Sequence, residues 1–272
     1  MSTQAQRALH FAALHRHASP LLLPNPWDAG TAKILASLGF EALATTSSGH
    51  AATTGALDGG VTREQAIGHA ATIVAATELP VSADLENGFA DDGDGVAETI
   101  RLALAAGLAG CSIEGYTRRD EAPIYDLPLA AERVAAAAEV AHGGSVQMVL
   151  TARAENYLHG RPDLADTISR LQAYQEAGAD VLYAPGLTSL EDIRRLVVSV
   201  DRPVNVLAVQ GVPPVATLAE IGVSRVSVGG AFAWAAIDGL LAAANELRAH
   251  GTYSYLERAA VGSRTARAAF RD

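Results

Sequence analysis

The sequence predicts a (β/α)8 barrel of the TIM type, and three observations support this prediction. The chain has 272 residues, which matches the length of eight strand–helix units. Short apolar runs alternate along it with longer amphipathic segments, as in a parallel sheet covered by helices. Several helical segments end in a glycine that leads directly into the next apolar run. No linker-like composition interrupts the pattern, so we expect one domain over residues 1–272, with residues 252–272 as a C-terminal helical extension.

The expected strands and helices follow one another in a regular order. Eight strands are predicted near residues 21–23, 42–45, 81–84, 110–114, 147–151, 181–183, 204–207 and 225–228. The helix after the second strand should begin with a capping box, in which the side chains of Thr62 and Gln65 each accept a backbone N–H. Further N-caps are predicted at Asp94, Asp163 and Ser189. Left-handed glycines are predicted at the helix ends Gly39, Gly107, Gly178 and Gly222.

An open, doubly wound sheet is the alternative architecture. Such sheets usually contain fewer strands and bind their ligand at a glycine-rich turn after the first strand. Here the first turn reads Pro24-Asn-Pro-Trp-Asp-Ala-Gly30, which matches neither the dinucleotide-binding pattern nor the P-loop pattern. The closed barrel is therefore the architecture that we expect.

Composition excludes several classes of protein. Hydrophobic residues make up 49% of the chain and charged residues 18%, which rules out a disordered protein. A formal net charge of −10 without a long basic run argues against a nucleic-acid partner. There is no signal-like apolar N-terminus and no run of about 18 apolar residues, so we expect a cytoplasmic protein without a membrane partner. One cysteine, Cys111, and one lysine, Lys33, leave little scope for a thiolate metal site or a Schiff base.

Acidic residues gather where the third and fourth strands are expected to end. Asp84 and Glu86 share a face if the chain there is extended, and Glu114 ends the neighbouring strand. The C-terminal ends of barrel strands form the active-site face, and carboxylates are the ligands that hard divalent cations prefer. These three residues therefore predict a Mg²⁺ site, with Mn²⁺ as an alternative ion. The competing interpretation is that they are solvated loop acids.

Three further groups at the same face are candidate substrate ligands. Arg153, after the fifth strand, can hold a carboxylate through two hydrogen bonds or can pair with a neighbouring acid of the barrel. Asn205, in the seventh strand, can bond a substrate oxygen or cap the barrel mouth. The hydroxylated run of Thr46, Ser47 and Ser48, followed by glycine, is either an anion-binding nest or a polar turn.

The residues that would move a proton are less well defined. His50, Asp58, Tyr116 and Tyr125 are all candidates for the general acid or base, and none of them stands out. The charged loop 116–126 is a candidate lid that would close over the site and exclude water.

Taken in order, these motifs resemble those of the isocitrate lyase / phosphoenolpyruvate (PEP) mutase superfamily. The matching segments are Pro26-Trp-Asp28-Ala, Thr45-Thr-Ser-Ser-Gly49, Leu57-Asp58-Gly, Ala83-Asp84-Leu-Glu86-Asn-Gly88, Ile113-Glu114, Ala152-Arg153-Ala-Glu155, Ala177-Gly-Ala-Asp180 and Val204-Asn205-Val. The resemblance implies a (β/α)8 barrel whose last helix is exchanged between the subunits of a homodimer or homotetramer. It also implies a Mg²⁺ ion and a small α-oxo or 2-hydroxy carboxylate.

The same resemblance assigns roles to individual residues. It implies that the metal is held mostly through water by Asp84, Glu86 and Glu114, and that Asp58 faces the metal. The substrate carboxylate would be bound by Thr46, Ser47 and Ser48 together with Arg153.

The chain departs from the superfamily at several of these positions. Isocitrate and methylisocitrate lyases carry a Lys-Lys/Arg-Cys-Gly-His loop after the fourth strand, whereas residues 116–126 of this chain contain no cysteine. The loop also lacks the lysine of the phosphonomutases. Glu86 stands where the family commonly has aspartate, and Ala184-Pro185-Gly186 replaces a glutamate or histidine after the sixth strand.

The chemistry that remains is Mg²⁺-dependent carbon–carbon cleavage or decarboxylation of a small α-oxo or 2-hydroxy carboxylate, through an enolate whose charge the metal absorbs. Asp58, Arg153 and Tyr116 are the catalytic candidates. Two alternatives stay open. One is an enzyme acting on a P–C bond, either a phosphonomutase or a phosphonopyruvate hydrolase, and the other is a barrel that binds an oxo acid without turnover.

Overall fold

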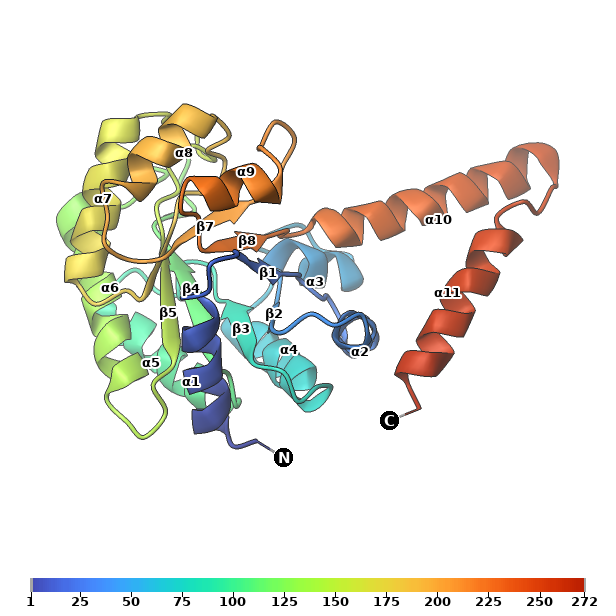
Figure 1. Ribbon diagram of the computed structural model, residues 1–272, viewed down its shortest axis with the longest axis horizontal. Helices are drawn as coiled ribbons and strands as arrows, with labels where there is room; N and C mark the ends of the chain where they lie inside the picture. Colours follow the sequence, from blue (N-terminus) through green and yellow to red (C-terminus); the bar gives the residue numbers. More distant parts are fainter. Residues whose placement is uncertain (1, 272) are drawn as a thin grey trace.

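The computed structural model describes residues 2–271 and confirms the predicted (β/α)8 barrel (Figure 1). Its strands are β1 (Leu21–Leu23), β2 (Leu43–Ala44), β3 (Val81–Asp84), β4 (Gly110–Glu114), β5 (Val149–Arg153), β6 (Val181–Tyr183), β7 (Val204–Leu207) and β8 (Arg225–Ser227). The strand order is β1-β8-β7-β6-β5-β4-β3-β2, and every neighbouring pair is parallel. The C-terminal ends of all the strands therefore meet at one face of the barrel.

The seam between β1 and β2 is joined by individual hydrogen bonds. One of them, 3.1 Å long, runs from the N–H of Ala44 to the chain just after β1. The buried side chain of Asn25 spans the same seam, and its amide donates to the carbonyl of Thr45 at 2.9 Å. The Asn25 oxygen accepts from the N–H groups of Val228 and Gly229, after β8, at 3.0 and 2.9 Å. Asn25 thus holds three strand ends together, and the barrel is nearly closed.

Helices cover the outside of the barrel. The helices α2 (Ala29–Ser37), α4 (Arg63–Ala75), α5 (Gly93–Ala105), α6 (Leu127–His142), α7 (Leu164–Glu176), α8 (Leu190–Val197) and α9 (Val215–Glu220) follow β1 to β7 in turn, and the short α3 (Ser47–Thr53) lies between β2 and α4. The capping box of Thr62 and Gln65 is confirmed, as are the N-caps Asp163 and Ser189. The N-cap of α5 is Asp92 rather than Asp94, because its carboxylate accepts the N–H of Gly95.

Two of the predicted local features can be compared directly with the structure. The four glycines at helix ends adopt φ values from +87° to +105°, as predicted. The fifth strand, however, begins two residues later than expected, because the side chain of Gln147 is held by the carbonyls of His142 and Gly144 in the preceding turn. As a result, Arg153 is the last residue of β5, and it pairs in register with Glu114 of β4.

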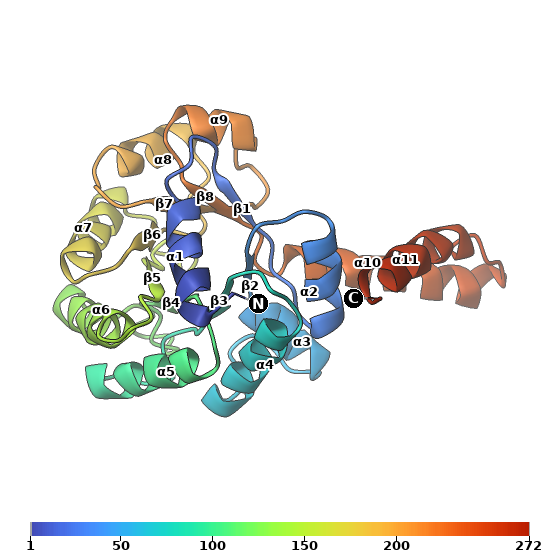
Figure 2. The same cartoon turned by 60° about the horizontal axis from the view of Figure 1, so that its bottom comes forward.

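The helix α1 (Gln4–Leu14) closes the N-terminal end of the barrel (Figure 2). Ala8, Phe11 and Leu14 are buried against apolar residues of the strands at this end. Phe11 approaches β4 so closely that a Cβ atom on Gly110 would lie 2.6 Å from its ring. Glycine at this position therefore makes room for the aromatic side chain.

A buried polar pair lies beside Phe11. Arg225 has only N–H donors, so the Nε2 atom of His15, 3.2 Å from its Nη1, must accept. The other ring nitrogen, Nδ1, then carries the proton and donates to the carbonyl of Phe11 at 2.8 Å. Burial, together with the charge of Arg225, lowers the pKa of His15 to about 3, so the ring stays neutral.

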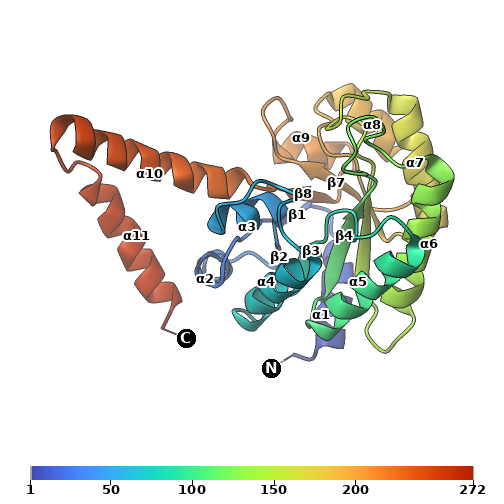
Figure 3. The same cartoon turned by 180° about the vertical axis from the view of Figure 1, so that it is seen from behind.

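The two last helices, α10 (Ala231–His250) and α11 (Leu256–Ala269), form a hairpin that projects from the barrel (Figures 1 and 3). In α10, Ala233 is buried, whereas Trp234, Leu240 and Leu241 are about half exposed or more. The exchange of helices between subunits stays a prediction. Within residues 2–271, no helix is long and apolar enough to cross a lipid bilayer.

Candidate active site

Arg153 contacts three carboxylates at the C-terminal face of the barrel. Its Nη1 atom donates to Asp84 at 3.2 Å, its Nη2 atom lies 3.0 Å from Glu114, and its Nε atom donates to Glu155 at 2.8 Å. Asp84 and Glu114 are the last residues of β3 and β4, and Glu155 lies just after β5. The pairing of Arg153 with neighbouring acids is therefore present, and its role as a substrate ligand stays a prediction.

Arg153, Glu114 and Glu155 border a cavity with a volume of about 300 Å³, which we call the inner cavity. It is lined by Ser47, Asp58, Gly59, Glu86, Glu114, Tyr116, Arg118, Arg153, Glu155, Leu158 and His159. A volume near 300 Å³ is at the lower end of the range for small-molecule sites. The inner cavity thus has the size expected for a small metabolite.

The prediction that Glu86 shares a face with Asp84 is wrong. β3 ends at Asp84, and Glu86 adopts a left-handed backbone conformation with φ +50°, which turns its side chain towards the loop after β4. There its Oε2 atom forms an ion pair with Arg118. The other oxygen of Glu86, Oε1, is buried and has no hydrogen-bond partner within residues 2–271.

Burial raises the pKa of several acids in this site, and most strongly those of Glu86 and Glu114. The pKa of Glu86 rises to about 7, because desolvation outweighs the attraction of Arg118 and Asp84 adds repulsion. Desolvation also raises the pKa of Glu114 well above its ordinary value, despite the charge of Arg153. For Glu155, burial acts in the same direction, but Arg153 and His159 together hold its pKa below the ordinary value. Without a further cation, Glu86 and Glu114 therefore favour their protonated forms more than an ordinary carboxyl does, whereas Glu155 stays ionised beside Arg153.

The donor atoms of the site suit a hard divalent cation. Two arginines face five carboxylates, those of Asp58, Asp84, Glu86, Glu114 and Glu155. The buried and unpartnered Oε1 atom of Glu86 is one open acceptor. Across residues 2–271, however, no three acidic, histidine or cysteine side chains lie close enough to chelate an ion directly. The residues fit a hydrated ion held through water, which is the form in which Mg²⁺ commonly binds.

The hydroxylated run after β2 is the start of a helix rather than a nest or a simple turn. Thr46 is the N-cap of α3, and its hydroxyl accepts the N–H of Gly49 at 3.3 Å. Ser47 lines the inner cavity, and its N–H donates to Asp84 at 3.3 Å. The hydroxyl of Ser48 lies 3.3 Å from that of the buried Thr46.

Asn205 lies deeper in the barrel than the inner cavity. Its amide donates to Ser227 at 3.0 Å, and its oxygen accepts from Arg225 at 2.9 Å. With these residues it lines a smaller cavity of about 60 Å³ that extends to Arg153 and Asp84. Asn205 is thus engaged within the barrel core, and its role as a substrate ligand stays a prediction.

The four acid–base candidates divide into two pairs. Asp58 and Tyr116 line the inner cavity, where the ring of Tyr116 stacks on that of His159 with centroids 3.8 Å apart. His50 instead stacks on a histidine of α4, and Tyr125 is buried with its hydroxyl donating to Asp91. Partial desolvation raises the pKa of Asp58, and the charge of Asp84 adds to this effect. The geometry therefore favours Asp58 and Tyr116 over the other two.

Arg118 also belongs to the site, although the sequence did not point to it. The signal was a pair of adjacent arginines in the charged loop, Arg118 and Arg119. The positive φ of Arg118, +63°, directs its side chain to Glu86, whereas Arg119 lies 3.5 Å from Asp91 at the surface. Nothing in the sequence distinguishes the two before the loop is folded.

Comparisons with known proteins agree with this fold. The family model for phosphoenolpyruvate phosphomutase matches residues 11–248. A crystal structure of a candidate lyase/mutase from Burkholderia cenocepacia J2315 has a TM-score of 0.92 and 52% identity, covering 93% of this chain and 92% of its own. A 2-methylisocitrate lyase of Halalkalibacterium halodurans is 29% identical over 210 residues, which is 74% of this chain and 67% of the relative.

An oxaloacetate decarboxylase of Chromohalobacter salexigens is 29% identical over 264 residues, covering 87% of this chain and 84% of the relative. The region matched by the family model contains all eight strands and the five carboxylates of the site. The predicted superfamily is thereby confirmed. This chain belongs to the phosphoenolpyruvate phosphomutase family, within the isocitrate lyase / PEP mutase superfamily.

Proposed function

We propose that this protein is a Mg²⁺-dependent lyase that cleaves a carbon–carbon bond of a small α-oxo or 2-hydroxy carboxylate, either between two carbon fragments or with loss of CO₂. The observation that carries the proposal is the contact of Arg153 with carboxylates from three neighbouring strand ends, beside a cavity of about 300 Å³. The names of the related lyase and decarboxylase support the same class of reaction.

Each group in the site has a role in this proposal. When bound, Mg²⁺ or Mn²⁺ supplies Lewis-acid stabilisation of the negative charge that develops as the bond breaks. Asp84, Glu86 and Glu114 hold the hydrated ion. Arg153 orients the carboxylates around it and presents its charge to the carboxylate of the substrate.

The remaining residues of the site act on the substrate itself. Ser47, at the cavity wall, adds a hydroxyl donor for the substrate carboxylate, and Thr46 and Ser48 support it from the start of α3. Asp58 and Tyr116, which line the same cavity, are the groups proposed to move a proton.

The charge of the site favours carbon–carbon chemistry over P–C chemistry. A phosphonate group carries a second negative charge that the carboxylate of an oxo acid lacks, and the inner cavity already has more carboxylates than arginines. The loop after β4 adds one arginine to the cavity and no lysine. A non-catalytic barrel that binds an oxo acid would bind such acids without forming a product, and a product assay distinguishes it from the lyase.

Replacing Asp84 with asparagine is expected to weaken Mg²⁺ binding about 10- to 100-fold and to reduce turnover by a similar factor. The substitution keeps the shape of the side chain but removes the charge that faces Arg153 and the N–H of Ser47. Titration calorimetry with Mg²⁺ alone measures the affinity. Mass spectrometry of the products from a panel of α-oxo and 2-hydroxy acids measures turnover.

The matched control for this experiment is Asp120→Asn, an exposed aspartate in the loop after β4, which should leave both quantities unchanged. Unchanged Mg²⁺ affinity in Asp84→Asn would contradict the metal assignment. Two other outcomes would contradict the lyase assignment. One is a phosphorus-containing product from phosphonopyruvate in ³¹P spectra, and the other is tight oxalate binding without a product from any acid of the panel.

We also propose that the hairpin of α10 and α11 is a contact between subunits of a homo-oligomer, a dimer or a tetramer. The side chains of Trp234, Ile237, Leu240 and Leu241 expose between 37% and 68% of their surface on one helix, an apolar area that monomers usually cover. Light scattering of the full chain is expected to give a mass of at least two protomers. A monomer at micromolar concentration would contradict the proposal.

A further inference from the structure

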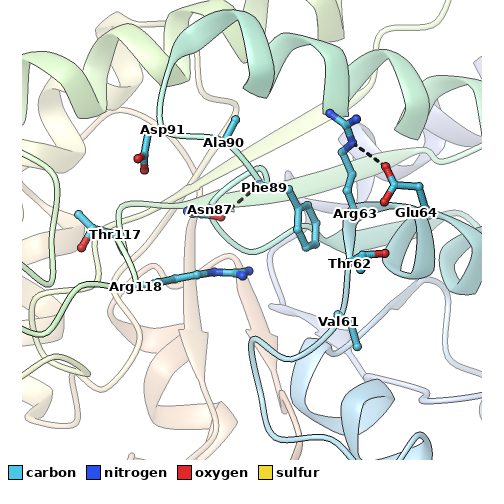
Figure 4. A pocket seen from close by; sticks show the side chains of 10 residues that line it. All are labelled: Val61, Thr62, Arg63, Glu64, Asn87, Phe89, Ala90, Asp91, Thr117 and Arg118. Carbon is cyan, nitrogen blue, oxygen red and sulfur yellow. Dashed lines mark hydrogen bonds and ion pairs between the residues drawn. The ribbon is translucent and has the colours of Figure 1, made fainter.

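Arg118 lines both the inner cavity and a second cavity beside it. This outer cavity has a volume of about 590 Å³ and includes Thr62 and Arg63 at the start of α4, and Asn87 and Phe89 from the loop after β3 (Figure 4). Among the residues that the structure describes, Arg118 is the one that lines both cavities. Its guanidinium is therefore placed to contact a ligand that reaches from one cavity towards the other.

The backbone is strained around the contacts of Arg118. Within residues 2–271, positive φ values occur at three residues other than glycine, namely Glu86 (+50°), Phe89 (+56°) and Arg118 (+63°). All three belong to one cluster, because Arg118 forms an ion pair with Glu86 and its guanidinium carbon lies 5.5 Å from the centre of the Phe89 ring. Strain of this kind persists where the surrounding structure enforces it, and it is concentrated at ligand clamps and switch regions.

The guanidinium of Arg118 retains hydrogen-bonding capacity for a ligand. It has five N–H donors, and its partners within the described chain are the carboxylate of Glu86 and, at 3.3 Å, the carbonyl of Gly59. Its side chain is 32% exposed, so it can be reached from solvent. Arg153 is 14% exposed and already faces three carboxylates. Arg118 is thus the more accessible of the two cations of the inner cavity.

We propose that Arg118 is a specificity-determining residue, which leaves Glu86 when the substrate binds and pairs with a second acidic group of the substrate at the boundary between the two cavities. The proposal rests on the proposed function and narrows its substrates to α-oxo or 2-hydroxy dicarboxylates. One carboxylate of such an acid lies near Arg153 in the inner cavity, and the other points towards the outer cavity. A planar guanidinium can bind a carboxylate through two parallel hydrogen bonds. Its contact with Glu86 uses only one carboxylate oxygen, so the substrate carboxylate would gain a second hydrogen bond.

The test uses a pair of ligands that differ in one group. Malate and 2-hydroxybutyrate share a 2-hydroxy carboxylate, and the distal carboxylate of malate is a methyl group in 2-hydroxybutyrate. Titration calorimetry of the full chain with excess Mg²⁺ is expected to show malate binding about 10- to 100-fold more tightly than 2-hydroxybutyrate of the same configuration. Arg118→Met should abolish this preference by lowering the affinity for malate alone, and Arg118→Lys should retain part of the preference.

A neighbouring arginine provides the matched control. Arg119→Met removes a charge from the same loop at a residue that pairs with Asp91 outside the inner cavity, and it should keep the preference for malate. Thermal unfolding of each variant shows whether it is folded. A lost preference would not come from unfolding, because unfolding would weaken the binding of both ligands equally.

Three results would overturn the proposal, and they are distinguishable from one another. Equal weakening of both ligands in Arg118→Met would mean that Arg118 only supports the cavity through Glu86. Equal affinities in the wild-type protein would leave the proposed function intact and remove the role of Arg118. Absence of binding by malate, 2-hydroxybutyrate and oxalate in the presence of Mg²⁺ would reject the proposed function, and this inference with it.

Discussion

Replacing Arg153 with methionine is expected to lower kcat/KM for the α-oxo acid substrate by about 10³-fold or more. Removing one preorganised donor from an anion-stabilising site lowers kcat by about 10²- to 10³-fold. Arg153 also orients three carboxylates, so its loss should have a larger effect. The same substitution should destabilise the fold by about 3–5 kcal/mol, the usual effect of leaving buried charges without their partner. Steady-state kinetics and chemical denaturation in EDTA measure the two effects.

The destabilisation should depend on pH. In the wild-type protein burial would raise the pKa of Glu155, but Arg153 and His159 hold it below its ordinary value. Ionised Glu155 therefore contributes stability above its ordinary pKa, and this contribution is lost as the pH falls through the folded value. Without Arg153 burial dominates, so the stability difference between variant and wild type should be largest above the ordinary pKa of glutamate, about 4.3, and should shrink as the pH falls below it and through the folded pKa of Glu155.

The control for this prediction is Arg119→Met, which removes an exposed arginine and is expected to change neither the activity nor the stability by a measurable amount. A variant Arg153→Met that keeps its activity within tenfold of the wild type would show that Arg153 has no part in the reaction. A stability difference that does not vary with pH would show that the three carboxylates are not coupled to it.

Replacing Phe11 with alanine is expected to destabilise the protein by about 3–5 kcal/mol, since it removes a fully buried aromatic side chain and leaves a cavity. The loss should be at the upper end of this range, because Gly110 has no side chain that can fill the space. Equilibrium denaturation monitored by circular dichroism measures it. Leu9→Ala, on the same helix but 62% exposed, is the matched control and should change the stability little. Similar losses in the two variants would contradict the packing described for α1.

The barrel could be predicted from the sequence because its signals are local. The Thr62–Gln65 capping box and the glycines at helix ends act within a few residues, and their spacing alone marks where each helix begins and ends. The closure of the seam by Asn25 could not be predicted, since its partners Thr45 and Val228 are 20 and 203 residues away. Long-range side-chain contacts of this kind exist only once the strands have their order.

The candidate site was predictable in part for the same reason. Asp84, Glu114 and Arg153 end successive strands, so a barrel necessarily brings them together. Glu86 lies beyond the strand end, in a left-handed conformation that the sequence Leu85-Glu86-Asn87 does not indicate. Ser47 lines the inner cavity, and its role as a substrate ligand stays a prediction. Its helix could not be predicted, because the segment Ser47–Thr53 is short and lacks an apolar periodicity.

The helix α1 restricts where small molecules can enter and leave the barrel. Since Phe11 and Leu14 seal the N-terminal end, entry and exit share the opposite mouth. A reaction that splits one acid into two fragments then has an order of departure. In the proposed lyase, the fragment nearer the mouth would leave first and the fragment at Arg153 would follow it, so an accumulating outer product would hold back the inner one.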